Sequence, residues 1–107
     1  LRDFNQGSVV QAMTLEHYAP MTEKHLERVM AEASSRWAIA DVLVIHRYGE
    51  LRPNDPIVCV AVWAAHRDAA FAACRYVIDE LKTRAPFWKQ ELTEEGRRWV
   101  APEPGAK

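Results

Sequence analysis

The sequence predicts an α+β domain of two layers, in which helices cover a mostly antiparallel sheet. β-rich runs and segments of helical periodicity follow one another in the order β-α-β-β-α-β-β, and the first six of these elements match the split β-α-β pattern. The 107 residues are 49% hydrophobic, which is enough apolar material for one core. We therefore expect a single domain over residues 1–101 and a flexible polar tail over residues 102–107.

The first half of the chain should contain one strand and one helix. The residues before Gly7 resemble the end of a strand, and Ser8–Tyr18 is a β-rich run with one clearly apolar face. Pro20 then opens a helix that takes Thr22 as its N-cap and ends near Arg36. Its buried face is defined by apolar residues at three-and-four spacing: Leu26, Val29, Met30, Ala33 and Trp37.

Two β-branched runs and a second helix follow. Val42–Tyr48, which Gly49 stops, and Ile57–Trp63 should pair antiparallel across a loop over residues 53–56. The second helix is expected over Arg67–Lys82, with an apolar stripe that packs on the sheet. The stripe contains Phe71, Cys74, Val77, Ile78 and Leu81.

The last elements are predicted to be two short strands. Pro86 cannot continue the second helix, and it biases Ala85 towards an extended conformation. Strands over Phe87–Leu92 and Arg97–Val100 should then be joined by a turn over residues 94–96.

Lys82 and Lys89 lie on either side of the stiff, apolar turn that Pro86 makes. A lysine ammonium is a compact charge whose pKa falls readily on desolvation, so it can serve as a nucleophile, a proton donor or an anion clamp. The plainer interpretation is that Lys82 complements the negative end of its helix while Lys89 is solvated on a strand. The spacing alone leaves both interpretations open.

Histidine and arginine are adjacent at two places. His66-Arg67 lies where the second helix begins, and the N–H groups of a helix N-terminus make a natural phosphate site. The forked guanidinium of arginine also matches the oxygens of a phosphate. A His-Arg pair that only links the end of a strand to solvent fits the sequence equally well. His46-Arg47 lies at a strand end with no helix after it, and it is interpreted as structural.

The cysteines and the other histidines are assigned no chemistry. Cys59 and Cys74 have apolar neighbours and no metal-ligand spacing, so we expect two buried thiols rather than a disulfide or a zinc site. His17 and His25 are interpreted as packing or surface residues. No metal site is predicted.

Charge and composition disfavour several classes of protein. The formal net charge is −1, without the basic stripe that a nucleic-acid-binding face needs. The longest apolar run, Ile57–Ala65, is too short for a membrane span and no signal segment opens the chain, so a cytoplasmic protein is expected. Gly-rich phosphate loops, Ser-His-Asp order and paired Cys-x-x-Cys do not occur in the sequence. What remains is a cluster of Lys, Arg and His that suits an anionic small molecule.

Five motifs follow one another along the chain: Leu15-Glu16-His17-Tyr18, Met21-Thr22-Glu23-Lys24, Val44-Ile45-His46-Arg47-Tyr48-Gly49-Glu50-Leu51, Ala65-His66-Arg67 and Leu81-Lys82-Thr83-Arg84-Ala85-Pro86-Phe87-Trp88-Lys89. In this order they resemble the large, catalytic subunit of molybdopterin synthase, the MoaE family. The resemblance runs from Arg2 to about Val100, and the last motif is highly specific. The family usually has a further N-terminal segment, so we expect that a segment before Leu1 is missing.

The resemblance implies a sulfurtransferase of molybdenum-cofactor biosynthesis with a fold of the α/β-hammerhead type. Such a protein converts cyclic pyranopterin monophosphate to the dithiolene of molybdopterin, with sulfur from the thiocarboxylated C-terminal glycine of a small ubiquitin-like subunit. The resemblance also implies a homodimer of large subunits, a heterotetramer with two small subunits, and no cofactor or metal. By motif position Lys82 and Lys89 are catalytic and also bind the substrate, together with Arg2, His66 and Arg67. Gln90 and Glu91, which follow Lys89, are further candidates for substrate binding.

A binding or regulatory module that holds an anionic pterin or phosphate ligand without turnover is the alternative, because the same cationic residues would serve it.

The length of the second helix predicts that the substrate site is shared between two chains. Its ends are roughly 22 Å apart at the usual rise per residue, and a pyranopterin monophosphate is about half that length. One ligand therefore cannot easily touch Arg67 and Lys82 of the same chain. We expect His66 and Arg67 to come from a neighbouring copy across a two-fold interface.

Overall fold

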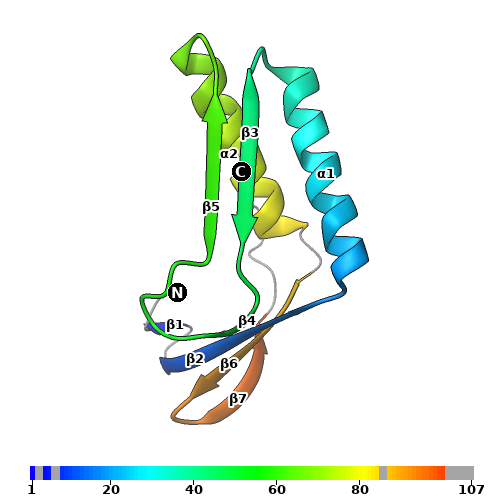
Figure 1. Cartoon of the computed structure of the whole chain (residues 1–107). Helices are drawn as coiled ribbons and strands as arrows, with labels where there is room; N and C mark the ends of the chain where they lie inside the picture. The colour runs from blue at the N-terminus through cyan, green and yellow to red at the C-terminus, as the bar shows by residue number, and fades with distance from the viewer. Residues whose placement is uncertain (2–3, 6–7, 85–86, 101–107) are drawn as a thin grey trace.

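The computed structural model describes residues 1, 4–5, 8–84 and 87–100, which form an α+β domain (Figure 1). The helices are α1 (Ala19–Arg36) and α2 (Arg67–Thr83). The strands are β1 (Phe4–Asn5), β2 (Ser8–His17), β3 (Asp41–His46), β4 (Gly49–Leu51), β5 (Val58–Trp63), β6 (Phe87–Thr93) and β7 (Gly96–Val100). The predicted class, helices on antiparallel sheets, is confirmed. The expected tail over residues 102–107 lies outside the described residues.

β3 and β5 form a two-stranded antiparallel sheet, and both helices lie on the same side of it (Figure 1). The register runs from Asp41 opposite Trp63 to His46 opposite Val58, so the predicted pairing of the two β-branched runs is confirmed. Because side chains alternate along a strand, every second residue faces the helices. These inward residues are Val42, Val44, Val60 and Val62.

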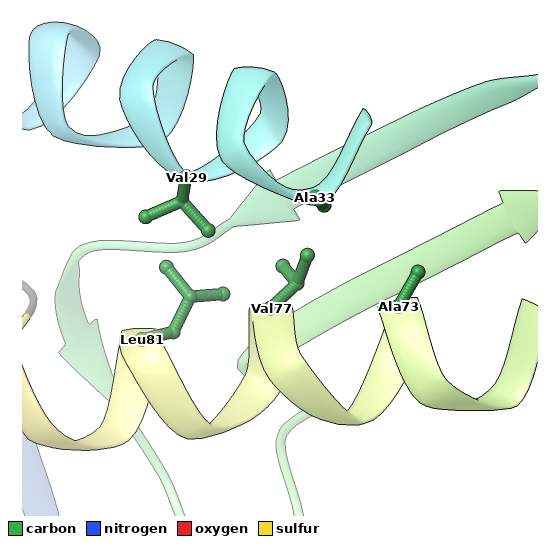
Figure 2. Close-up of a cluster of buried hydrophobic side chains, with 5 residues drawn as sticks. All are labelled: Val29, Ala33, Ala73, Val77 and Leu81. Atoms are coloured by element: carbon green, nitrogen blue, oxygen red, sulfur yellow. The ribbon is translucent and has the colours of Figure 1, made fainter. Parts of the chain in front are cut away.

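The two helices approach each other closely because small residues lie between them. Ala33 of α1 and Ala73 of α2 are both fully buried, and their methyl groups let ridges and grooves of the helices interlock. Val29, Val77 and Leu81 fill the space along the same contact (Figure 2). A fully buried valine or leucine contributes about 1.5–3 kcal/mol to stability. This packing fixes the direction of α2, which carries a candidate site residue at each end.

α1 begins earlier than predicted, because its N-cap is Tyr18 and not Thr22. Pro20 occupies the first helical turn, where its missing N–H is not needed. Thr22 lies inside that turn, and its Oγ1 donates to the backbone O of Tyr18 at 3.3 Å. The predicted end of the helix at Arg36 is confirmed.

Two predictions of burial are wrong. Phe71 is 73% exposed, because it lies on the far side of α2 from the buried stripe. Cys59 is exposed on β5, since its strand position faces away from the helices, whereas Cys74 is half-buried. Both thiols are free. The stripe that packs against the core is built on Ala73, Val77 and Leu81.

A second sheet has β2 at its centre and lies beyond one end of the helices (Figure 1). β2 pairs with β1, β4 and β6, and β7 pairs with β6, all antiparallel. The split β-α-β arrangement is therefore wrong, because β3 and β5 pair with each other in a separate sheet. β4 was not predicted, since it has only three residues and begins at Gly49, whose φ of 84° suits glycine.

The two predicted C-terminal strands are confirmed as β6 and β7, which pair with each other. Gly96, at the end of the predicted turn, has a φ of 110° and is the first residue of β7. The predicted turn is therefore shorter by that one residue.

Candidate functional site

A cavity of about 170 Å³ lies between the two sheets and the C-terminal end of α2. We call it the lysine pocket. Apolar side chains such as Leu15, Ile57 and Leu81 form most of its wall. Its polar groups are His46, Lys82, Thr83 and Lys89. A small-molecule site usually encloses ~300–1,000 Å³, so the lysine pocket of one chain is smaller than a complete site of that kind.

Lys82 and Lys89 reach the lysine pocket from two different elements. Lys82 lies in the last turn of α2, where its charge also complements the negative end of the helix. Lys89 lies opposite Leu15 in the pairing of β6 with β2, on the strand face that it shares with Phe87. The structure thus brings together the two lysines that the sequence separates by Pro86, a residue outside the described part of the chain.

An aromatic column stands at the same end of the domain. Phe87 stacks on His46 with 4.2 Å between ring centroids, and its ring is 5.4 Å from that of His17. Tyr48 packs against His17 at 4.3 Å. The Nδ1 atom of His17 lies 2.8 Å from Thr22 Oγ1, which ties the column to α1. Of these four aromatic residues, the cavity lining includes His46 and Phe87.

His46 is a pocket residue that the sequence interpretation missed. Its Nδ1 is 2.7 Å from the backbone O of Arg47. A carbonyl oxygen can only accept, so Nδ1 carries the proton in this contact and Nε2 holds the lone pair of the neutral ring. Burial lowers the pKa of His46 below its ordinary value of 6.5, and the charges of Lys89 and His17 lower it further against the opposing effect of the Arg47 hydrogen bond.

Gln90 and Glu91, the two residues after Lys89, differ in placement. Glu91 is almost fully buried and forms an ion pair with Arg98 at 3.2 Å between Oε1 and Nη2. Gln90 faces the other side of β6, where Arg97 Nη1 donates to its Oε1 at 3.4 Å. Neither residue is part of the pocket lining.

His66 and Arg67 lie at the opposite end of α2 from Lys82. Both are exposed, and together with Ala65 and Asp68 they line a separate, shallow hollow. His66 is the N-cap of α2 but makes no side-chain capping bond. One chain therefore does not bring this pair to the lysine pocket, and the helix from Arg67 to Lys82 rises by roughly 22 Å. Arg2, another predicted substrate contact, lies outside the described residues.

The arrangement suits binding of an anion next to an apolar surface. Ammonium groups supply charge and donors, and the surrounding apolar wall strengthens their interactions by excluding water. In the described part of the chain, no three His, Cys, Asp or Glu side chains are grouped so that they could hold a metal ion. No helix among those residues is long and apolar enough to cross a membrane.

Fold and site together define a small α+β protein with a lysine-lined pocket at one end of a helix and a His-Arg pair at the other. The family model described as MoaE protein matches residues 1–84. The molybdopterin synthase catalytic subunit of Pseudomonas aeruginosa is 56% identical over 100 residues, which cover 94% of this chain and 67% of that subunit. The chain belongs to the MoaE family, and it spans about two thirds of the length of this relative.

Solved structures agree with the assignment. The crystal structure of molybdopterin synthase from Staphylococcus aureus superposes with a TM-score of 0.87 at 32% identity, over 94% of this chain and 74% of that chain. A complex of subunits 1 and 2 of molybdopterin-converting factor from Helicobacter pylori gives a TM-score of 0.74 over 94% of this chain and 65% of that chain. At 19% identity the second likeness concerns the fold alone. The fold that the sequence resemblance implied is thus confirmed as that of MoaE proteins.

Proposed function

We propose that this chain is the catalytic subunit of a molybdopterin synthase. It converts cyclic pyranopterin monophosphate, also called precursor Z, into molybdopterin. The sulfur comes from the thiocarboxylated C-terminus of a small ubiquitin-like subunit. The observation that carries the proposal is that Lys82 and Lys89 line one largely apolar pocket in a chain of the MoaE family.

The two lysines suit this reaction because the substrate and the sulfur donor are both negatively charged. The substrate carries a phosphate and the sulfur donor is a thiocarboxylate, and both need fixed cationic partners. Attack by the sulfur also develops negative charge on oxygen, which a preorganised ammonium group stabilises in the transition state. Substrate, sulfur donor and the lysines suffice for these steps, so we propose no cofactor.

The substrate site is proposed to be shared between two copies of the chain. His66 and Arg67 supply a histidine, an arginine fork and a helix N-terminus, which suit a phosphate. The length of α2 keeps them from the lysine pocket of their own chain. A second copy that faces the pocket with this pair would also supply the wall that a single chain lacks.

An apolar surface on the β3–β5 sheet supports such a dimer. On the side away from the helices, Leu43 is 44%, Ile45 54% and Trp63 51% exposed. We call this surface, which also includes Cys59, the apolar face. Contiguous apolar surface of this kind marks interfaces in proteins.

The strands of the apolar face are also oriented so that a dimer through this face can form a shared site. Val58 and His46, at one end of the β3–β5 sheet, line the lysine pocket, whereas Trp63 at the other end is only three residues before His66. A two-fold axis that lies in the plane of this interface, perpendicular to the strands, makes the two copies run antiparallel. The Trp63 end of one copy then lies over the Val58 end of the other, roughly 17 Å along the strand. His66 and Arg67 are thereby carried towards the partner's pocket.

The small subunit is proposed to bind at the open side of the lysine pocket, one on each chain of the dimer, to give a heterotetramer. An extended C-terminal tail needs a groove with apolar and main-chain contacts. Phe87 and Ile57 supply apolar surface in the cavity, and Lys89 lies beside Phe87 on the same strand face. We further propose a cytoplasmic location, since the free, exposed thiol of Cys59 suits a reducing compartment.

A turnover assay tests the proposed function. The purified chain is mixed with thiocarboxylated small subunit and pyranopterin monophosphate, and dithiolene product is measured against a reaction with inorganic sulfide in place of the small subunit. We expect product only with the small subunit. Tight binding of the pterin without product formation would instead identify a non-catalytic binding module.

A further inference from the structure

We propose that His46 is the general base of the lysine pocket, which takes a proton from the water that releases the transferred sulfur. This inference rests on the proposed function and adds a residue and a step to it. The residue is on the wall of the pocket that holds Lys82 and Lys89.

The proposed sulfur transfer requires a hydrolysis step. After the thiocarboxylate sulfur has bonded to the substrate carbon, it is still bonded to the acyl carbon of the small subunit's terminal glycine. Water must break this acyl–sulfur bond: its oxygen bonds to the acyl carbon, and sulfur leaves with the bonding electrons as a thiolate. The small subunit departs as a carboxylate, and two protons are released, one to the base and one to solvent. A general base typically accelerates such a step by about 10²–10⁴-fold.

The lysines are poorly suited to accept that proton. An ammonium group that stabilises anions has no lone pair, so the cationic role and the base role need different residues. His46 provides the second kind of group, because its Nδ1–H donates to Arg47 O and leaves the lone pair on Nε2. Among the described residues Nε2 makes no hydrogen bond.

The surroundings hold this ring in place and keep it neutral. Phe87 stacks on it with an interplanar angle of 17°. The charged or titratable groups that face it are Lys89 from β6 and His17 from β2, with Lys82 of α2 in the same pocket lining. Arg47 points its guanidinium elsewhere, since Nη1 donates to Pro56 O at 2.9 Å. Burial and the positive charge of Lys89 lower the pKa of His46, so the base form is present at neutral pH.

The test uses His46→Asn, because an asparagine amide can still donate to Arg47 O but cannot act as a base. Wild-type and variant proteins react in a single turnover with thiocarboxylated small subunit and pyranopterin monophosphate. Samples are denatured at successive times, and the amount of the covalent conjugate of small subunit and substrate is measured by mass spectrometry. We expect the conjugate to form within about threefold of the wild-type rate and to be hydrolysed about 10²-fold more slowly. The wild-type hydrolysis rate should fall as the pH drops through the pKa of His46, which lies below 6.5, and this fall should be absent in the variant.

The matched control is His25→Asn. Burial also lowers the pKa of His25, but His25 lies on α1 and is not part of the pocket lining, so the hydrolysis rate of this variant should stay within about threefold of wild type. Folding is verified by circular dichroism, and His46→Gln replaces His46→Asn if the latter does not fold.

A folded His46 variant that hydrolyses the conjugate at the wild-type rate, with the wild-type pH profile, would overturn the assignment. Equal loss of conjugate formation and hydrolysis would also overturn it, because that pattern indicates a structural role. If the wild type itself forms neither conjugate nor product, the proposed function fails rather than this inference alone.

Discussion

A shared substrate site predicts that two inactive variants restore each other's activity. Lys82→Ala removes a pocket lysine, and Arg67→Ala removes the arginine at the other end of α2, roughly 22 Å away. In a mixed dimer, one site lacks both groups and the other site has both. If chains exchange at random in an equal mixture, half of the dimers are mixed and each has one intact site of two. The mixture should therefore show about one quarter of wild-type activity, although each variant alone shows about 1% or less.

The assay is dithiolene formation with thiocarboxylated small subunit and pyranopterin, after the two variants are unfolded together and refolded. Formation of mixed dimers is verified by native mass spectrometry. A mixture of Lys82→Ala with Lys89→Ala is the matched control, because both changes fall in the same pocket and every mixed dimer then lacks an intact site. No recovery in verified mixed dimers of the first pair would refute the shared site, and so would equal recovery in the control pair.

Three further outcomes are expected. Lys82→Ala and Lys89→Ala should each keep the fold but lower product formation by about 10²-fold or more, and near-normal turnover by either folded variant would remove its catalytic assignment. Val77→Ala should lower the free energy of unfolding by about 2 kcal/mol in urea titrations, whereas Phe71→Ala should change it by less than about 0.5 kcal/mol, and equal effects would contradict the packing of α2. Burial, and next the charge of Arg28, lower the pKa of His25 below 6.5 in the folded chain. As the pH drops below 6.5, this histidine is therefore protonated in the unfolded chain before it is protonated in the folded one, and the melting temperature should fall. His25→Leu should flatten that dependence, and an unchanged slope would exclude His25 as its source.

The helices and the β3–β5 pair could be predicted because their patterns are local. Helical periodicity and β-branched runs are properties of neighbouring residues, and they gave the end of α1 and the pairing of the two runs correctly. Which strands share a sheet is not a local property. The pairing of β2 with β4 and β6, and the separation of the β3–β5 pair into its own sheet, depend on packing across the domain, so the separate sheets were missed.

The errors on α2 and β5 have the same origin. Phe71 fits the three-and-four spacing of the predicted apolar stripe. The packing of Ala33 against the side of α2 that carries Ala73 nevertheless decides which side of that helix is buried (Figure 2). Cys59 lies in an apolar run, yet its strand position faces away from the helices.

Part of the candidate site could be read from the sequence, because chain geometry restricts it. The sequence predicts a turn at Pro86 between Lys82 and Lys89, on which the expectation of a common site rested, and the rise of α2 separates Lys82 from His66-Arg67. His46 could not be recognised in this way. Its alternation with Val42 and Val44 indicates an inward side chain, but only the position of β6 shows that it faces Phe87 and the lysine pocket.

The most direct test is a structure of the dimer with pyranopterin monophosphate bound. We expect one ligand in each lysine pocket, in contact with Lys82 and Lys89 of one chain and with Arg67 of the other chain. The apolar face, with Leu43 and Ile45, should be buried between the copies. A ligand held by residues of a single chain, or bound away from both lysines, would contradict this arrangement.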